Sequence, residues 1–424
     1  MERLPGFRDF YPEPVPLSDG WSMELRQHLF DGWRAVARRY GFREYDGPPL
    51  ETLELYTAKS GDEIVHQLYH FDDKGGRAVS LRPEMTPTLA RLVAASERHY
   101  KKPIKWYAIP QLFRYERQQK GRLREHFQFN ADIVGEPDPA ADAELIALLI
   151  DLLRGCGLAA DDFRVRLSSR NAWRDFFRQR GGQPEREYDF YQIVDKLERT
   201  SPEESARQLD SLGISFGEIQ DFIRSAQPTD ELSRILDGLE AHGLRGFVQI
   251  DYAIVRGLAY YTGPVFEAFD GKGRFRAIAG GGRYDHLLRL MSGGRADLPA
   301  AGFGLGDVVL TELLRERQLV PPLRPALDAF FLIEDQALRP ATLRMVHDLR
   351  AAGFSVDYPL SQAKSDKQFK RALELGAIHT LRLEPGSAGA VVARVKHLAS
   401  RAERIAPAAE IAAILRGALP SSTG

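Results

Sequence analysis

Several features that define whole classes of protein are scarce or missing in this chain. A single cysteine, Cys156, stands among 424 residues, so no disulfide can form within the chain and no zinc site built on thiolates is expected. Cys156 sits in an apolar run of helical character, which indicates a buried structural thiol. No apolar run approaches the roughly 20 residues that a membrane span needs, and the first residues contain no apolar signal region. We therefore expect a cytoplasmic protein that does not use a membrane.

An excess of charge of one sign is missing as well. The chain has 58 lysines and arginines against 59 aspartates and glutamates, a balance that does not mark a nucleic-acid binder but leaves room for a local basic patch. There is no internal repeat and no long low-complexity tract. Hydrophobic residues make up 43% of the chain and charged residues 28%, as in globular proteins, and the length suits two or three domains.

Apolar periodicity and turn residues divide the first three quarters of the chain into helices and strands. A long amphipathic helix is expected over Trp21–Tyr40, with Gly41 as its C-terminal cap. Strands over Lys105–Phe113 and Glu125–Val134, joined by a polar segment, predict an antiparallel pair around a basic loop. Further helices are expected over Thr86–Ala95, Ala140–Cys156 and Asp307–Arg317, and further strands over Phe247–Tyr252 and Pro264–Phe269.

Two stretches differ in character from this framework. Residues 170–246 are densely charged and helical with short breaks, which indicates a small helical insertion. Beyond the linker-like Pro321-Pro322, strands alternate with helices, a pattern typical of a small α/β domain with a mostly parallel sheet. We therefore predict one domain over residues 1–320 and a second over residues 326–420.

The most informative stretch lies between residues 80 and 135. It contains the Arg-Pro-Glu-x-Thr element of Leu81–Pro87 and the pattern Phe-Arg-x-Glu-Arg…Gly-Arg-x-Arg-Glu of Phe113–Glu125. The second pattern resembles motif 2 of class II aminoacyl-tRNA synthetases, and the first resembles the amino-acid-binding loop of the histidyl-tRNA synthetase family. The segments Val255–Glu267 and Gly280–Asp285 are similar to sequences peculiar to that family. These elements follow the family's order across nearly the whole chain.

The resemblance implies a fold and a reaction. The fold is an α+β catalytic domain of class II type, an antiparallel sheet flanked by helices, over residues 1–320, followed by an anticodon-binding α/β domain over residues 326–420. The reaction uses ATP with Mg²⁺ to convert L-histidine into histidyl-adenylate, and then transfers histidine to the 3′ end of tRNA-His. No metal site made by the protein alone is implied.

Arginine suits the phosphate contacts of such a reaction because its planar fork matches phosphate oxygens and stays charged. By resemblance, Arg114 bridges the histidine carboxylate and the α-phosphate, while Arg256 acts on the α-phosphate as a catalytic cation. Glu116 would accept from the adenine amino group, and Arg122 would meet the outer phosphates. Without the resemblance, the run around Arg114 reads equally as a solvated basic hairpin, and Arg256 as an ordinary ion-paired residue.

Selection of histidine needs partners for an amino group and an imidazole ring. A carboxylate facing the ring is expected physically, because it fixes the orientation and tautomer of the imidazole. The resemblance assigns Glu84, Thr86 and Gln128 to the amino group. It assigns Asp132 and Tyr261 to the two edges of the ring, and Tyr260 to the lining of the pocket.

Two positions depart from the family pattern. Motif 3 normally carries an arginine on the helix after its glycine-rich strand, but here Gly306 is followed by Asp307-Val308-Val309-Leu310. Without this arginine, the contribution of motif 3 to the adenine and γ-phosphate contacts has no residue in this chain. In addition, Ala259 stands where many members have aspartate.

Contacts with tRNA and with a second subunit follow from the resemblance too. Arg117 and Gln119 of the motif 2 loop would approach the acceptor end of tRNA. A basic cluster in the second domain would contact tRNA phosphates, although such a cluster alone is more often a solvated helix face; it consists of Lys364, Lys367, Lys370 and Arg371. The helix over Trp21–Tyr40 resembles motif 1, which forms the dimer interface of the class, so we predict a homodimer. Its periodicity fits packing on its own sheet about as well.

Three functions compete. The first is a histidyl-tRNA synthetase, and the alternative is the non-catalytic regulatory subunit of ATP phosphoribosyltransferase in histidine biosynthesis, which shares this fold. A third is an RNA-binding or stress-sensing module that uses the same fold as a platform. Regulatory relatives commonly lose the tRNA-binding domain and the catalytic arginines. Glu84, Arg114, Arg256 and a full C-terminal domain are present here, which favours the enzyme.

Overall fold

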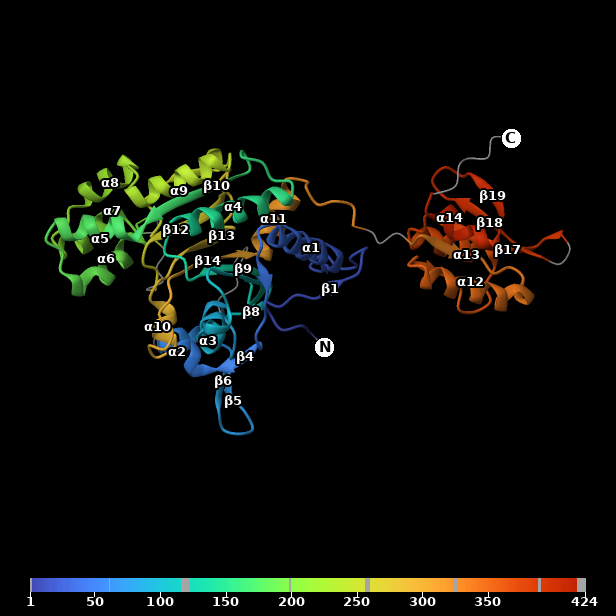
Figure 1. The fold of residues 1–424 in the computed structure, drawn as a ribbon, viewed down its shortest axis with the longest axis horizontal. Coiled ribbons are helices and arrows are strands. Elements are labelled where there is room, and N and C mark those ends of the chain that lie inside the picture. The colour runs from blue at the N-terminus through green and yellow to red at the C-terminus, as the bar shows by residue number, and fades with distance from the viewer. Residues whose placement is uncertain are drawn as a thin grey trace. The chain divides into compact units, whose positions relative to one another are not determined.

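The computed structural model describes residues 2–60, 62–115, 123–197, 200–255, 260–323, 327–387 and 390–417. It divides into two compact units (Figure 1). The large unit comprises Met1–Phe10 and Leu25–Pro321, and the small unit comprises Tyr11–Glu24 and Pro322–Gly424. Among the described residues, none of the helices combines the length and the hydropathy required to cross a membrane.

A mainly antiparallel sheet forms the centre of the large unit. Its strands are β3 (Arg43–Glu44), β7 (Ile104–Ala108), β8 (Gln111–Phe113), β9 (Glu125–Val134), β10 (Phe163–Ser169), β11 (Val248–Ile250), β12 (Pro264–Asp270), β13 (Ala279–Arg283) and β14 (Ala300–Gly306). The order is β11-β10-β12-β13-β14-β9-β7-β3, with β8 paired to β9. Only the two edge strands among those described, β11 and β3, pair with their neighbours in parallel. The predicted antiparallel pair is confirmed by β8 and β9, and the polar loop predicted between them lies outside the described residues.

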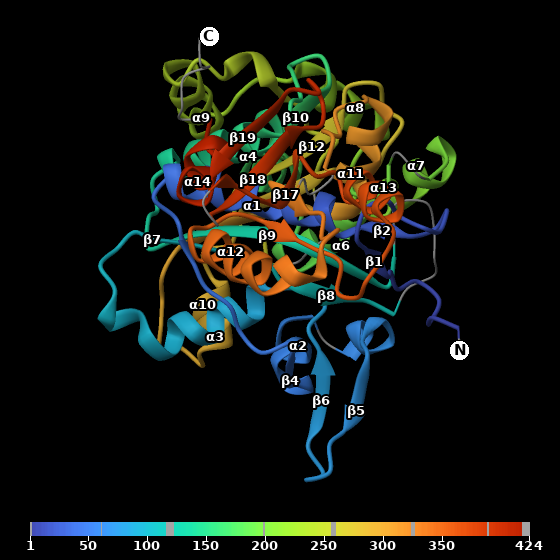
Figure 2. The ribbon, with the colours of Figure 1, turned by 90° about the vertical axis from the view of Figure 1, so that its right-hand side faces the viewer.

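Helices cover this sheet and extend beyond one end of it. Helix α1 (Met23–Arg39) begins just before the Leu25–Pro321 segment of the large unit and continues into it. The other helices of this unit are α2 (Leu53–Ser60), α3 (Thr86–Ser96), α4 (Ala140–Gly155), α5 (Arg170–Gln179), α6 (Glu187–Val194), α7 (Pro202–Asp210), α8 (Phe216–Ser225), α9 (Asp230–Ala241), α10 (Leu287–Met291) and α11 (Asp307–Glu316). Helices α5 to α8, green to yellow-green in Figure 1, gather at one end of the unit and lie within residues 170–246, where the sequence predicts a helical insertion. A separate small sheet of β4 (Leu50–Thr52), β6 (Ala78–Leu81) and β5 (His70–Asp72) carries a hairpin that projects outward in both views (Figures 1 and 2).

Helix α1 packs on the sheet of its own unit. Its apolar stripe is buried, and Trp33 stacks edge-on against Phe129 of β9 with ring centroids 6.0 Å apart. Gly41 follows the helix with a φ of +76°, and Phe42 N–H donates to the Ala37 carbonyl at 3.0 Å, which confirms the predicted cap. Packing within the unit therefore accounts for the periodicity of α1 without a second subunit.

A buried ion network ties the start of the chain to the strands and helix around the sheet centre. Arg8 Nε donates to Glu125 at 2.6 Å and its Nη1 donates to Asp307 at 2.8 Å. Glu125 begins β9 and Asp307 begins α11, so both elements are fixed at the same point. A second buried pair, Arg283 with Asp142, joins β13 to α4.

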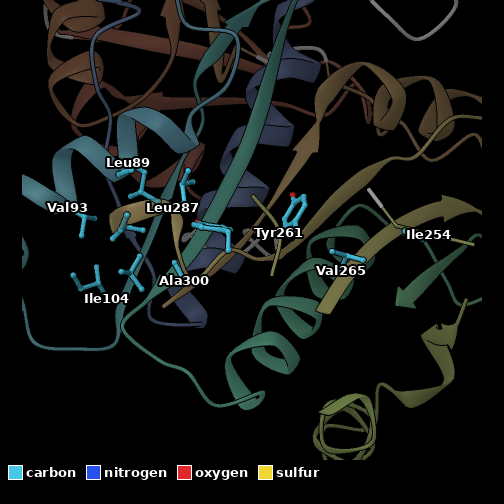
Figure 3. Packing of buried hydrophobic residues seen from close by; sticks show 12 residues of the cluster. Leu89, Val93, Ile104, Ile254, Tyr261, Val265, Leu287 and Ala300 are labelled. Atoms are coloured by element: carbon cyan, nitrogen blue, oxygen red, sulfur yellow. The ribbon is translucent and has the colours of Figure 1, made fainter. Parts of the chain in front are cut away.

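A hydrophobic cluster supports the sheet beside these pairs. Figure 3 shows residues of this cluster, which runs from Leu89 and Val93 on α3 through Ile104 to Tyr261 and Val265. Each of these side chains is buried. The cluster also contains Tyr284, whose hydroxyl donates to Asp132 of β9. Packing in the cluster therefore holds the tyrosine that contacts this carboxyl group.

The small unit has a mixed sheet. Its strands are β15 (Ala329–Phe331), β16 (Val356–Asp357), β17 (His379–Pro385), β18 (Val391–His397) and β19 (Glu403–Pro407), its helices are α12 (Arg339–Ala351), α13 (Ser365–Glu374) and α14 (Ile411–Leu415), and β1 (Phe10–Tyr11) and β2 (Trp21–Ser22) lie near the start of the chain. Strands β16, β15 and β17 run in parallel, but β18 and β19 continue the sheet antiparallel. The predicted mostly parallel sheet is therefore wrong, because its last strands are joined by hairpins and need no crossover helix.

Candidate active site

The polar row on β9 follows from strand geometry. Successive side chains of a strand point to opposite faces, so Gln128, Asn130 and Asp132 share one face. Phe129 and Ala131, which alternate with them, are fully buried in the core on the other face. A ten-residue strand thus presents an amide, an amide and a carboxylate in line above the sheet.

Glycines on the neighbouring strand β14 leave the space that these side chains occupy. Gly302 pairs with Asp132, and a Cβ at Gly302 would lie 2.0 Å from Asp132 Oδ1. A Cβ at Gly304 would lie 2.6 Å from Gln128 Cδ. Only hydrogen at both positions lets the side chains of β9 lean across the adjacent strand.

A small cavity opens above these residues. It has a volume of about 80 Å³, and we call it the first cavity. It brings together seven residues predicted from the sequence, namely Glu84, Thr86, Arg114, Gln128, Asp132, Tyr260 and Tyr261. Its remaining lining comes from Asn130, Tyr284, Phe303 and the glycines at 280, 302 and 304.

Asp132 is the buried charge of the first cavity. Its residue is 5% exposed, and Tyr284 donates its hydroxyl hydrogen to Oδ1. Burial raises the pKa of Asp132 to about 7, against which the Tyr284 hydrogen bond acts in the lowering direction. A carboxyl group with this pKa changes charge near neutrality, so a ring N–H that approaches it stabilises the ionised form.

Tyrosines form one wall of the first cavity. The rings of Tyr260 and Tyr261 lie 4.7 Å apart, and Tyr260 meets Tyr284 edge-on at 5.8 Å. Tyr261 belongs to the hydrophobic cluster (Figure 3), so its ring is held by packing. The wall is apolar along the rings and polar at the hydroxyls, a combination that suits a flat heteroaromatic ligand.

Arg114 stands at the boundary between two cavities. It follows β8, and its Nε donates to the Pro83 carbonyl at 3.0 Å. Pro83 precedes Glu84, so this bond joins the motif 2 strand to the loop that carries Glu84 and Thr86. Arg114 also lines a larger second cavity, and its guanidinium can therefore contact a group in each.

The second cavity has a volume of about 270 Å³. It shares Arg114, Gln128, Gly280 and Gly304 with the first cavity. Its other lining residues are Leu123, His126, Glu267, Arg276, Ala277, Ile278, Ala279, Gly306, Val308 and Val309. Two adjoining spaces with an arginine at their boundary suit a reaction between a small and a larger substrate, held in contact.

Five predicted site residues, Glu116, Arg117, Gln119, Arg122 and Arg256, lie outside the described residues. The sequence interpretation assigned no role to other residues that the cavities contain. Asn130 lies between Gln128 and Asp132 at the same two-residue spacing, and this alternation could have indicated it as a site residue. Tyr284 follows Arg283 in the Gly-Gly-Gly-Arg-Tyr-Asp run, and that position could have indicated it too. No local pattern marks His126, Glu267 or Arg276.

Comparison with known proteins decides the family. The profile described as histidyl-tRNA synthetase matches residues 19–307. The chain belongs to the histidyl-tRNA synthetase family. It is thus an enzyme of the ligase class, which confirms the resemblance carried by the motifs and favours the enzyme over the regulatory alternative.

Individual relatives extend the match over the whole chain. A histidine–tRNA ligase of Opitutus terrae is 44% identical, over 98% of this chain and 98% of its own length. The chloroplastic/mitochondrial histidine–tRNA ligase of Arabidopsis thaliana is 40% identical, over 88% of this chain and 78% of its own. The crystal structure of histidyl-tRNA synthetase from Nostoc superposes with a TM-score of 0.77 at 23% identity, over 96% of this chain and 98% of the other. This likeness confirms the predicted class II fold.

Proposed function

We propose that this chain attaches L-histidine to tRNA-His in two steps, by forming histidyl-adenylate from ATP and then transferring histidine to the 3′ end of the tRNA. The observation that carries this proposal is the meeting of two cavities at Arg114, with a buried carboxyl group in the smaller one. The first cavity takes histidine and the second takes ATP.

Histidine is selected by groups that a different amino acid would leave unpaired. Asp132 accepts from the imidazole, held in place by Tyr284. Glu84, Thr86 and Gln128 receive the α-amino group. An amino acid without a ring N–H leaves the buried Asp132 carboxylate with the Tyr284 hydroxyl but without the charge-assisted bond from the ligand, and a lost bond of this kind is what lets binding sites discriminate most strongly.

The first step is an attack of the histidine carboxylate on the α-phosphorus. Arg114 holds the carboxylate and the α-phosphate together, which brings the reacting atoms into line. Negative charge grows on the α-phosphate oxygens during the attack, and Arg114 together with Arg256 stabilises it. Glu116 accepts from the adenine amino group and Arg122 meets the outer phosphates, both by analogy with the family.

Among the described residues that line the second cavity, Glu267 would hold the Mg²⁺ that accompanies ATP. A carboxylate is the kind of hard oxygen ligand that Mg²⁺ prefers. Bound in this way, the metal would neutralise charge on the leaving pyrophosphate.

Transfer to tRNA uses other parts of the chain. Arg117 and Gln119 contact the acceptor end, and the small unit, proposed as the anticodon-binding domain, contacts the tRNA through its basic cluster. The four side chains of this cluster, Lys364, Lys367, Lys370 and Arg371, are all exposed on and beside α13. The chain acts in the cytoplasm as a homodimer. Because the apolar face of α1 is already covered, its exposed side, with Gln27, His28 and Asp31, would face the partner subunit.

Amino-acid-dependent ATP–pyrophosphate exchange tests the proposal. Purified protein with ATP and Mg²⁺ should exchange pyrophosphate with histidine and with no other standard amino acid. A folded protein that stays silent with histidine would contradict the enzyme assignment and favour the regulatory subunit. Sedimentation velocity on the same sample measures the predicted dimer, because a single monomer-sized species would refute it.

A further inference from the structure

The first turn of α11 brings no positive charge to the second cavity. Asp307, the first residue of the helix, is buried in its pair with Arg8. Val308 and Val309 line the cavity with apolar surface. The family's motif 3 places an arginine in this region, so the nucleotide site lacks a cation on the side formed by α11.

Arg276 reaches the same cavity from a different element. It lies on the connection between β12 and β13 and lines the second cavity together with Val308 and Val309. Two residues later, the Ile278 carbonyl accepts from Gly306 N–H at 3.3 Å, and Gly306 is the N-cap of α11. Arg276 therefore stands beside the helix turn from which the arginine is missing.

The connection that carries Arg276 is anchored at its start. Asp270, the last residue of β12, accepts from the backbone N–H groups of Lys272 at 3.2 Å and Arg274 at 2.9 Å. At the other end, Ile278 N–H donates to the Ala268 carbonyl at 2.7 Å. The position of Arg276 at the cavity is thus set by the hairpin β12–β13 and its hydrogen bonds.

The structure assigns to Arg276 the role of the missing motif 3 arginine, so that it binds the triphosphate of ATP in the second cavity. This inference rests on the proposed function. Arg276 is exposed at the rim of the cavity, where a flexible cation can follow the outer phosphates. The apolar surface of Leu123, Ile278 and Val309 leaves the adenine an apolar wall, and phosphate oxygens match a guanidinium.

Steady-state pyrophosphate exchange with Arg276→Ala tests the assignment. Loss of one charge-assisted contact should raise the KM for ATP on the order of 10- to 100-fold and leave the KM for histidine within about twofold. Arg274→Ala is the matched control, because Arg274 is exposed on the same connection, pairs with Glu316 at 2.8 Å and does not line the cavity. Equal behaviour of the two variants would overturn the inference.

A transplanted arginine makes the test independent of any damage to the hairpin. Val309 is half-buried and lines the cavity, so Val309→Arg should restore tight ATP use in the Arg276→Ala background. Calorimetry with ATP and with adenosine separates phosphate from base. Arg276→Ala should weaken ATP alone, and an equal loss for adenosine would overturn the triphosphate assignment.

Failure of this inference can be distinguished from failure of the proposed function. If wild-type protein shows no exchange with histidine, the proposed function is wrong, and Arg276 has no ATP to bind in such a reaction. If wild-type protein is active while Arg276→Ala matches it, only the role of Arg276 is refuted.

Discussion

The two cavities that meet at Arg114 are built in different ways. The first, of about 80 Å³, is formed around the polar side chains of β9 and the glycines of β14, with a buried carboxyl group and a wall of tyrosines. The second, of about 270 Å³, takes its polar groups from β9, β12, Arg114 and the connection before β13. Recognition of the amino acid thus depends on the packed sheet, where each position constrains its neighbours. Contacts to the nucleotide depend on long cations, which can be supplied from more than one place in the fold.

Removing the arginine shared by both cavities should have the largest effect. Arg114→Ala removes a donor from the transition state, which typically costs on the order of 10²–10³ in rate. Single-turnover adenylate formation measures this loss. Arg77→Ala, an exposed arginine paired with Asp73 at 2.7 Å on the projecting hairpin, serves as the control and should retain full activity. If Arg114→Ala changed the rate of adenylate formation by less than about threefold, Arg114 would have no role in the chemical step.

Asp132→Asn should weaken binding in the first cavity alone. An amide lacks the full negative charge that imidazole meets here, so histidine affinity should fall by about 1.5–3 kcal/mol while ATP affinity is unchanged. Titration calorimetry with each ligand distinguishes the two. Equal losses for both ligands would show that the substitution disturbs the fold and not the recognition.

The same substitution should stabilise the protein without ligand at alkaline pH. The pKa of Asp132 is raised from 3.8 to about 7, so its ionised form is penalised in the folded state, and stability falls as pH rises from about 4 to 7. Asparagine carries no charge to bury. The free energy of unfolding of the variant should therefore exceed that of the wild type by up to about 4 kcal/mol at pH 8, and should equal it at pH 4. Urea unfolding at both pH values checks this, and a gain at pH 4 would contradict the cause.

Gly302→Ala probes the rigidity of the first cavity. The added Cβ would lie 2.0 Å from Asp132 Oδ1, so Asp132 must move, and overpacking of this kind costs about 1–3 kcal/mol. Histidine binding and thermal stability should both fall. Gly32→Ala is the control, since a Cβ there meets nothing within 4 Å and the position is helical. If Gly302→Ala matched this control, the close approach would not determine the site.

The smallest effect is expected in the basic cluster of the small unit. Replacing Lys364, Lys367, Lys370 and Arg371 with glutamine should weaken tRNA binding severalfold and reduce its salt dependence, while pyrophosphate exchange stays unchanged. Filter binding at two salt concentrations measures both. Arg344→Gln, an exposed arginine on α12, should leave both quantities as they are. If tRNA binding by the fourfold variant kept the salt dependence of the wild type, the cluster would be a solvated helix face without tRNA contacts.

Local pattern predicted those parts of the fold and the site that depend on local chemistry. Periodicity located α1, and the aromatic and β-branched run located β9, while Gln128 and Asp132 were assigned by the family resemblance alone. The predicted strand over Lys105–Phe113 is interrupted, because Pro110 has no N–H to donate to a ladder, and the structure has β7 and β8 instead.

Long-range contacts could not be predicted in the same way. Tyr284 meets Asp132 from 152 positions away, and no spacing reveals such a pair. Arg276 lies in a connection without periodicity, so only the fold shows that it lines the same cavity as Val309. The order of the sheet decides both contacts, and that order results from pairing between distant strands.

The ion network of Arg8 has a consequence for how the protein is made. Arg8 leaves the ribosome early, but its partner Asp307 lies 299 positions later, so the buried site stays incomplete until α11 has been synthesised. Contacts of such sequence separation form slowly, because a long loop must close first. Until Asp307 is present, Glu125 and Arg8 lack the third member of their ion network. During this interval the nascent chain exposes apolar surface to other molecules. The synthesis of α11 thus sets the moment at which the Arg8 network can close around β9.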